Sequence, residues 1–230
     1  MTGRYAIYLA PDRDTPLWRF GTTWLGRDPE TGVRAVDRFG LPRDLHAEIT
    51  GTPSRYGFHG TLKPPFRLAE GADEQYLKIA LRRFAATRRP FAVPGLRLGE
   101  LGGFLALLPN DGCPALYDLA GDCITMLDAL RAPLSDAEIT RREPDRLTPV
   151  QRENLECWGY PYVLKEYRFH MTLTEKLGLE TMAKVFPVLA QATADIVDRP
   201  ISVSSVALFH EPAPSEPFRL ISRFEFAVAN

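Results

Sequence analysis

Hydrophobic and polar residues alternate in two short segments of the chain that are nearly copies of each other. Residues 56–62 read Tyr-Gly-Phe-His-Gly-Thr-Leu, and residues 167–173 read Tyr-Arg-Phe-His-Met-Thr-Leu. Alternation with a period of two predicts a half-buried β-strand at each place. The Tyr, Phe and Leu positions then share the face turned to the core, whereas His-x-Thr occupies the opposite, polar face.

The pattern of elements around these two segments repeats as well. In the first half we expect a strand over 5–9, a motif strand that ends at Pro64-Pro65, and a helix over 74–89. Two strands should follow near 91–98 and 104–108, joined by a Gly102-Gly103 turn, and then a helix over 116–130. In the second half we expect a motif strand over 167–174, a helical stretch near 179–197, and strands near 201–209 and 218–228. Pro187 either kinks that helix or starts a new one.

A second similarity supports an internal duplication. The stretch that starts at Pro90 (Pro-Phe-Ala-Val-Pro-Gly-Leu) resembles the one that starts at Pro200 (Pro-Ile-Ser-Val-Ser-Ser-Val), at nearly the offset that separates His59 from His170. We therefore predict one bilobal α+β domain over 1–230 with a central cleft. Lobe one is centred on 50–131, a connector covers 132–153, and lobe two is centred on 154–228, with strands free to be exchanged between the lobes.

Composition narrows the classes of partner. The chain has 230 residues, of which 45% are hydrophobic and 25% charged, which is an ordinary globular balance. A net charge of −1 gives no overall attraction to nucleic acid or to an anionic membrane. No apolar run has the length of a membrane helix, and the N-terminal stretch does not read as a signal peptide. Three cysteines without a C-x-x-C pair favour a reducing, cytoplasmic setting.

The polar faces of the motif strands carry groups suited to phosphoryl chemistry. His59 and His170 titrate near neutral pH, so they can divide the work of general base and general acid. Thr61 and Thr172 can donate hydrogen bonds to phosphoryl oxygens. Lys63 and Arg168 add one cation per lobe to the same faces, as candidate phosphate ligands.

Two His-x-Thr strands, one per lobe, resemble the 2H phosphoesterase superfamily, and the longer strings around them look most like its DUF1045-like branch linked with phosphonate utilisation. The resemblance covers Tyr5 to Phe226. It implies a bilobal α+β fold of the LigT-like type, with two antiparallel β-sheets and flanking helices, and a site that needs no metal or other cofactor. It also implies His59 and His170 as the catalytic pair, Thr61 and Thr172 as phosphate donors, and a cyclic phosphodiester as substrate, either a 2′,3′-cyclic nucleotide or a cyclic sugar phosphate.

The sequence leaves other partners and functions open. The partner is expected to be a small phosphorylated substrate, with neither a membrane nor an obligate protein partner. Ligation or cleavage of RNA ends is an alternative, as is a non-catalytic protein that binds a phosphorylated metabolite. A zinc site built from His59, His170 and His210 is less favoured, because the spacing is not that of a typical site. For Trp158, Tyr160 and Tyr162, packing is favoured over stacking on a ligand.

Overall fold

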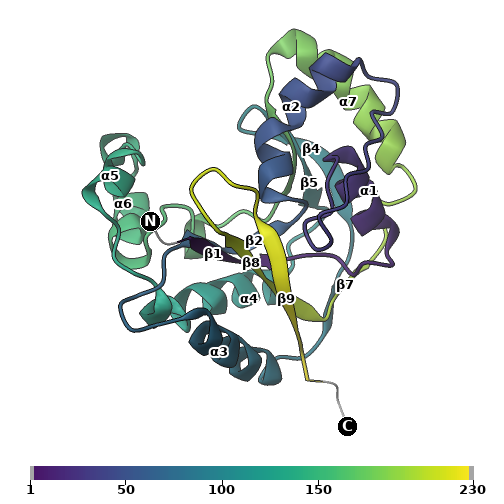
Figure 1. The fold of residues 1–230 in the computed structure, drawn as a ribbon. Coiled ribbons are helices and arrows are strands. Elements are labelled where there is room, and N and C mark those ends of the chain that lie inside the picture. Colours follow the sequence, from purple (N-terminus) through teal and green to yellow (C-terminus); the bar gives the residue numbers. More distant parts are fainter. Residues whose placement is uncertain (1–2, 228–230) are drawn as a thin grey trace.

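The computed structural model describes residues 3–227 and folds them around one large antiparallel sheet (Figure 1). Its strands are β1 Arg4–Leu9, β2 Gly60–Phe66, β3 Phe91–Val93, β4 Leu96–Leu101, β5 Phe104–Pro109, β6 Met171–Lys176, β7 Ile201–Val203, β8 Ser205–Glu211 and β9 Arg219–Glu225. Its helices are α1 Pro16–Trp24, α2 Arg43–Tyr56, α3 Glu74–Ala86, α4 Pro114–Thr125, α5 Asp136–Thr140, α6 Pro149–Trp158 and α7 Leu179–Thr193. Three 3₁₀ turns, η1 Asp128–Leu130, η2 Pro144–Arg146 and η3 Leu164–Glu166, connect them.

The two halves of the chain run through the same order of elements. In each half a motif strand (β2 or β6) is followed by a helix (α3 or α7), a three-residue strand (β3 or β7) and a two-stranded hairpin (β4–β5 or β8–β9). The two short strands pair antiparallel with each other, with Ala92 opposite Ser202. These residues also correspond in the second sequence similarity, so the repeat units meet at equivalent positions.

All pairings in both sheets are antiparallel, and the fold is of the α+β class with two antiparallel sheets, as predicted. The sheets are unequal: one has seven strands in the order β4-β5-β6-β2-β1-β8-β9, and the other consists of β3 and β7. The motif strands β2 and β6 are therefore neighbours in a single sheet. The hairpin β4–β5 follows β2 in the chain but lies beside β6, whereas β8–β9 follows β6 but lies on the β2 side, next to β1.

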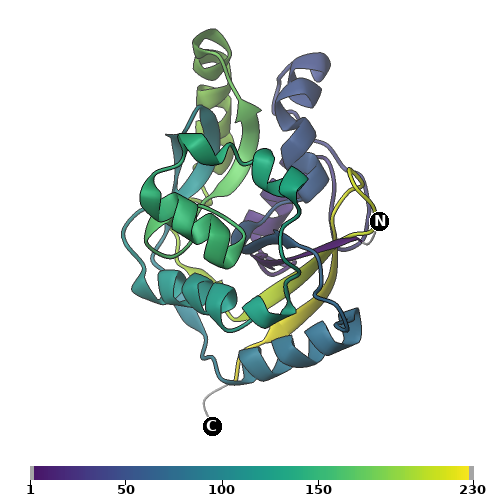
Figure 2. The ribbon, with the colours of Figure 1, turned by 90° about the vertical axis from the view of Figure 1, so that its left-hand side faces the viewer.

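Helices cover the sheet, and the buried hydrophobic side chains form two clusters, one large and one of eight residues that includes Tyr8 and Phe218. Figure 1 shows α3 and α4 on one side of β1, β8 and β9, with α4 packed on β2 and α3 on β9. Helix α2 packs on β6, so the first half of the chain also contacts the second motif strand. The large cluster includes side chains from both halves, such as Leu62, Leu107, Leu173 and Val206. In Figure 2 the segment with α5 and α6 lies toward the viewer, in front of the sheet.

The motif strands start later than the alternation predicted. Tyr56 is the last residue of α2, β2 begins at Gly60, and β6 begins at Met171. The prediction that Pro64-Pro65 ends the first motif strand was wrong, because β2 continues to Phe66. Strand β6 pairs with β2 only at its start, and on the other side the two prolines lie in the register shift between the pairs Ile7–Lys63 and Tyr5–Phe66, where the ladder with β1 is interrupted.

Helix α7 runs unbroken through Pro187, so this proline does not start a new helix. Helices α1 and α2, and the helices of the connector, were not predicted. Helix α6 nevertheless carries a local signal, because Thr148 and Gln151 form a capping box around Pro149. The predicted strand over 218–228 corresponds to β9, and residue 228 lies outside the described residues. Within residues 3–227 no helix has the length and apolar character needed to cross a membrane.

Candidate functional site

A cleft of about 730 Å³ opens above the junction of the two motif strands. Its walls come from the end of α2, the β4–β5 turn, the segment from α5 to η3, and the strands β1, β2 and β6. His59, Thr61, His170 and Thr172, the four residues singled out by the repeated motif, all line it. This volume is that of a typical small-molecule site, and it leaves room for more than a phosphate group.

The pairing of β2 with β6 explains how the motifs come together. Gly60 and Met171, the middle residues of the two His-x-Thr motifs, lie opposite each other. His59 and His170 each directly precede the first residue of their strand, so both lie next to this pair. The two motifs thus meet at their middle residues, with a histidine before and a threonine after each of them.

Gly60 is required at this junction. A Cβ atom at this position would lie 2.3 Å from the ring of Phe169, which packs beneath the second motif. Phe169 and Met171 are both buried, so the ring has no free space into which it can move. The absence of a side chain at Gly60 therefore allows the two motif strands to approach.

His59 is held in one orientation by its own backbone. Its Nδ1 lies 2.8 Å from the carbonyl oxygen of Gly57, so Nδ1 carries the hydrogen and Nε2 keeps its lone pair. Nε2 lies 3.2 Å from Oγ1 of Thr61, whose hydroxyl donates to it. The imidazole stacks on Tyr8 with ring centroids 3.6 Å apart. Gly57 allows this arrangement because its φ of 81° and ψ of 168° suit glycine and strain other residues.

His170 repeats the arrangement in the second motif. Its Nδ1 lies 2.8 Å from the carbonyl oxygen of Arg168, two residues earlier, as in the first motif. Phe104 of β5 flanks the ring, with centroids 5.5 Å apart. Both histidines thus have the same tautomer, and both leave Nε2 for a molecule in the cleft.

The environment keeps both imidazoles uncharged near neutral pH. Burial, together with a smaller effect of positive charge on His170, lowers the pKa of His59 to about 4, and the bond to Gly57 opposes this. Burial likewise lowers the pKa of His170, and the bond to Arg168 opposes this. An anion in the cleft would reverse these effects, because it favours the imidazolium form.

A hydrogen bond ties the second motif to the first strand. Tyr167 donates from its hydroxyl to the carbonyl oxygen of Thr61 over 2.7 Å. The tyrosines that open the two motifs, Tyr56 and Tyr167, line the cleft, although the alternation assigned them to the core. Phe58 and Phe169 are buried in the core, as predicted.

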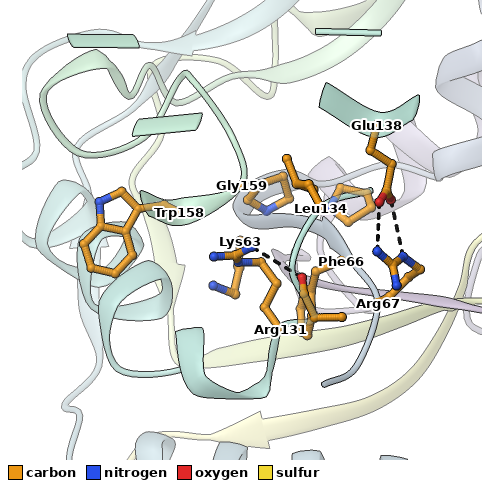
Figure 3. Close-up of a pocket in the computed structure, with 11 residues that line it drawn as sticks. Lys63, Phe66, Arg67, Arg131, Leu134, Glu138, Trp158 and Gly159 are labelled. Carbon is orange, nitrogen blue, oxygen red and sulfur yellow. Dashed lines mark hydrogen bonds and ion pairs between the residues drawn. The ribbon is translucent and has the colours of Figure 1, made fainter. Parts of the chain in front are cut away.

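Lys63 does not face the cleft, contrary to the prediction. Thr61 pairs with Tyr8, but Lys63 pairs with Ile7, so one step on β1 spans two on β2. This bulge turns Lys63 to the core side of the sheet. There the side chain is 1% exposed, and Nζ donates to the Ile124 carbonyl and to Asp128, each over 3.2 Å. Lys63 lines a small cavity of about 10 Å³, and Figure 3 shows it with Arg131, Trp158 and Gly159, which line the same cavity.

Arg168 does reach the cleft. Its side chain is exposed, and it lines the cleft next to His170. It forms no ion pair with another described residue, so its charge is available to a ligand. Of the two candidate cations, the structure therefore brings only Arg168 to the motif histidines.

Several cleft residues were missed from sequence. Tyr8 of β1 lies under His59, and Arg4, Arg142 and Tyr160 line the same wall. Tyr160 and Tyr162 both face the cleft, whereas Trp158 lines the small cavity behind it. Arg4, Tyr8 and Arg142 come from segments far from the motifs in sequence and had no local signal. Tyr160 and Tyr162 belong to the aromatic stretch just before the second motif, for which packing was the favoured interpretation.

The structure gives no support to a zinc site with three histidines. His210 stacks on Tyr5, and these two residues pair across β1 and β8. Tyr5 and Tyr8 point to opposite faces of the sheet, so His210 lies on the face away from His59. Within residues 3–227 no group of three or more His, Cys, Asp or Glu side chains is arranged to hold a metal.

Comparisons with known proteins find relatives that match most of this chain. Two curated relatives, from Janthinobacterium sp. (strain Marseille) and Laribacter hongkongensis (strain HLHK9), both carry the name ribose 1,5-bisphosphate phosphokinase PhnN. The first is 37% identical over 230 residues (97% of this chain, 51% of the relative), and the second is 37% identical over 229 residues (94% and 50%). The chain thus spans about half the length of the curated relatives it matches.

Among solved structures, similarity is found to a phosphoesterase (TM-score 0.44, 12% identity, 99% of each chain) and to E. coli LigT complexed with NADP+ (TM-score 0.42, 13% identity, 98% of each chain). Residues 61–219 match the family described as "Protein of unknown function (DUF1045)". Since this match spans more than half of the sequence and contains most of both motif strands, the chain belongs to the DUF1045 family.

Proposed function

We propose that the protein is a phosphoesterase that opens a cyclic phosphodiester to a phosphomonoester by two-histidine acid–base catalysis without a metal. The observation that carries the proposal is the junction of Gly60 with Met171, which sets His59 and His170 in one cleft with equivalent orientation. General acid–base catalysis needs one group that accepts a proton and one that donates a proton, and two Nε2 atoms that face one ligand can fill these two roles. A structural role for the histidines would not require the same tautomer in both.

In this reaction one imidazole takes a proton from water through Nε2 as the water oxygen bonds to phosphorus. The bond from phosphorus to the ring oxygen breaks, and the other imidazole, protonated at Nε2, donates its proton to that oxygen. Thr61 and Thr172 donate hydrogen bonds to the non-bridging oxygens, so Thr61 leaves its contact with His59 when a phosphate binds. Arg168 offsets the negative charge at the rim.

The site and the relatives support a phosphorylated sugar as the substrate class. We infer a five-membered cyclic phosphate on a sugar, either a 2′,3′-cyclic nucleotide or a cyclic pentose phosphate, because a cleft of about 730 Å³ has room for a sugar beside the phosphate. The two PhnN relatives are named for an activity on ribose 1,5-bisphosphate, which supports a phosphorylated pentose as the sugar.

The test is hydrolysis of a panel of cyclic nucleotides and cyclic pentose phosphates in excess chelator. We expect His59→Ala and His170→Ala each to reduce turnover by about 10²–10⁴-fold. His210→Ala is the matched control, because this histidine lies on the other face of the sheet, and it should keep its activity. Turnover that persists in both motif variants, or that chelator abolishes and a divalent cation restores, would contradict the proposal.

A further inference from the structure

The cleft extends beyond the histidines to a group of side chains that the proposed reaction does not use. We call it the phenol–guanidinium cluster, and it consists of Arg4, Tyr8, Tyr56, Arg142 and Tyr160. All five line the cleft, and they come from β1, the end of α2 and the segment between α5 and η3. The cluster is adjacent to His59, since Tyr8 stacks on that ring and the Tyr56 ring lies 6.4 Å from it.

The hydroxyl of Tyr8 is placed to serve a ligand. The residue is 1% exposed, yet it lines the cleft. Its hydroxyl makes no hydrogen bond with another described residue, and the protein does not fully enclose the hydroxyl oxygen. Burial raises the pKa of Tyr8 well above its ordinary value, so the hydroxyl keeps its proton and remains a donor.

The two arginines bring positive charge to the same wall. Arg4 and Arg55 share the buried carboxylate of Glu211, at 2.6 Å and 3.1 Å, so two guanidinium groups face one acid there. Arg142 lies over the ring of Tyr160, 4.7 Å from its centroid, and it forms no ion pair with any residue in 3–227. Its charge is held in position by an aromatic ring and is free for an anion.

The charge of the cleft differs from that of the molecule. Its lining has four cationic side chains, Arg4, Arg142, Arg168 and Lys176, against two carboxylates, Glu166 and Glu175. The whole chain has a net charge of −1. Two of the cations, Arg4 and Arg142, belong to the cluster rather than to the second motif. One phosphate between the histidines therefore leaves two positive charges uncompensated, that of Arg142 and the one that remains where Arg4 and Arg55 share Glu211.

We propose that the phenol–guanidinium cluster binds a second phosphate group, so that the preferred substrate is a cyclic phosphate whose sugar carries a further phosphate ester. The proposal rests on the proposed function for the placement of the cyclic phosphate. The guanidinium groups of Arg4 and Arg142 balance the charge of the second phosphate, and the hydroxyl of Tyr8 donates to its oxygens. The cluster thus selects the substrate and takes no part in proton transfer.

The test compares matched pairs of substrates. One pair is 2′,3′-cyclic AMP with a free 5′-hydroxyl and the same molecule with a 5′-phosphate, and the other is a cyclic ribose phosphate with and without a 5-phosphate. In the wild type, kcat/KM should favour the phosphorylated member by about tenfold or more. Arg142→Met should reduce this ratio about tenfold through KM. Arg141→Met, a neighbouring exposed arginine outside the cleft, should preserve the ratio.

Equal kcat/KM values within each pair, or a ratio that Arg142→Met leaves unchanged, would overturn the proposal. A binding measurement separates this outcome from failure of the proposed function. Calorimetry with His170→Ala protein would compare a pentose bisphosphate with the corresponding monophosphate, with and without Arg142→Met. If no cyclic probe is hydrolysed, the proposed function fails. The second-phosphate site is then supported by tighter bisphosphate binding that depends on Arg142, and refuted by equal or absent binding.

Discussion

Acidification should destabilise this protein through His59. The ordinary pKa of histidine is 6.5, and burial lowers that of His59 to about 4 in the folded protein. The unfolded chain therefore takes up a proton at this residue at a higher pH than the folded protein does. The stability that the neutral imidazole provides is complete above pH 6.5 and is lost as the pH falls from there toward 4.

The size of the effect follows from the shift in the pKa of His59. A shift from 6.5 to about 4 corresponds to about 3 kcal/mol in the free energy of unfolding. About 2 kcal/mol of this is lost between about pH 7.5 and about pH 5. His46, His170 and His210 also have pKa values lowered by burial, so they add to the loss in the same direction.

Urea unfolding of the wild type and of His59→Gln at these two pH values isolates the contribution of His59. The loss of stability on acidification should be about 2 kcal/mol smaller in the variant. His210→Gln, the control on the other face of the sheet, should retain the contribution of His59. An equal loss in wild type and His59→Gln would refute the reasoning. So would nitrogen-detected NMR of the four histidines if it showed His59 titrating near its ordinary value.

Further predictions concern the backbone around the motifs. Gly60→Ala places a methyl group against the ring of Phe169, so it should cost roughly 1–3 kcal/mol in urea unfolding and reduce turnover. Gly57→Ala should cost about 1–3 kcal/mol and, by NMR, weaken the Nδ1 tautomer of His59, because φ at this position is 81°. Lys63→Met should leave KM for the cyclic phosphate unchanged, because the lysine lies on the core side of the sheet. A KM that rises several-fold would instead indicate that Lys63 contacts the phosphate.

The repeated motif carried most of the information about the candidate site. His59, Thr61, His170 and Thr172 were found as a set because their spacing recurs, and the structure places all four in one cleft. The alternation along the strand failed at Lys63, since a period of two assumes a regular ladder. The bulge between Thr61 and Lys63 depends on the pairing with β1, which no local pattern shows.

The sequence by itself determined the class of fold, the repeat and the four His-x-Thr residues of the motifs, because these depend on local patterns. Only the tertiary structure decided that the two motif strands are neighbours in one sheet, since their pairing joins residues more than a hundred positions apart. It also decided which side chains surround the histidines. Tyr8, Arg4 and Arg142 reach the cleft through the pairing of β1 and the course of the connector. Contacts between distant segments arise from packing of the whole chain, so short-range patterns do not contain them.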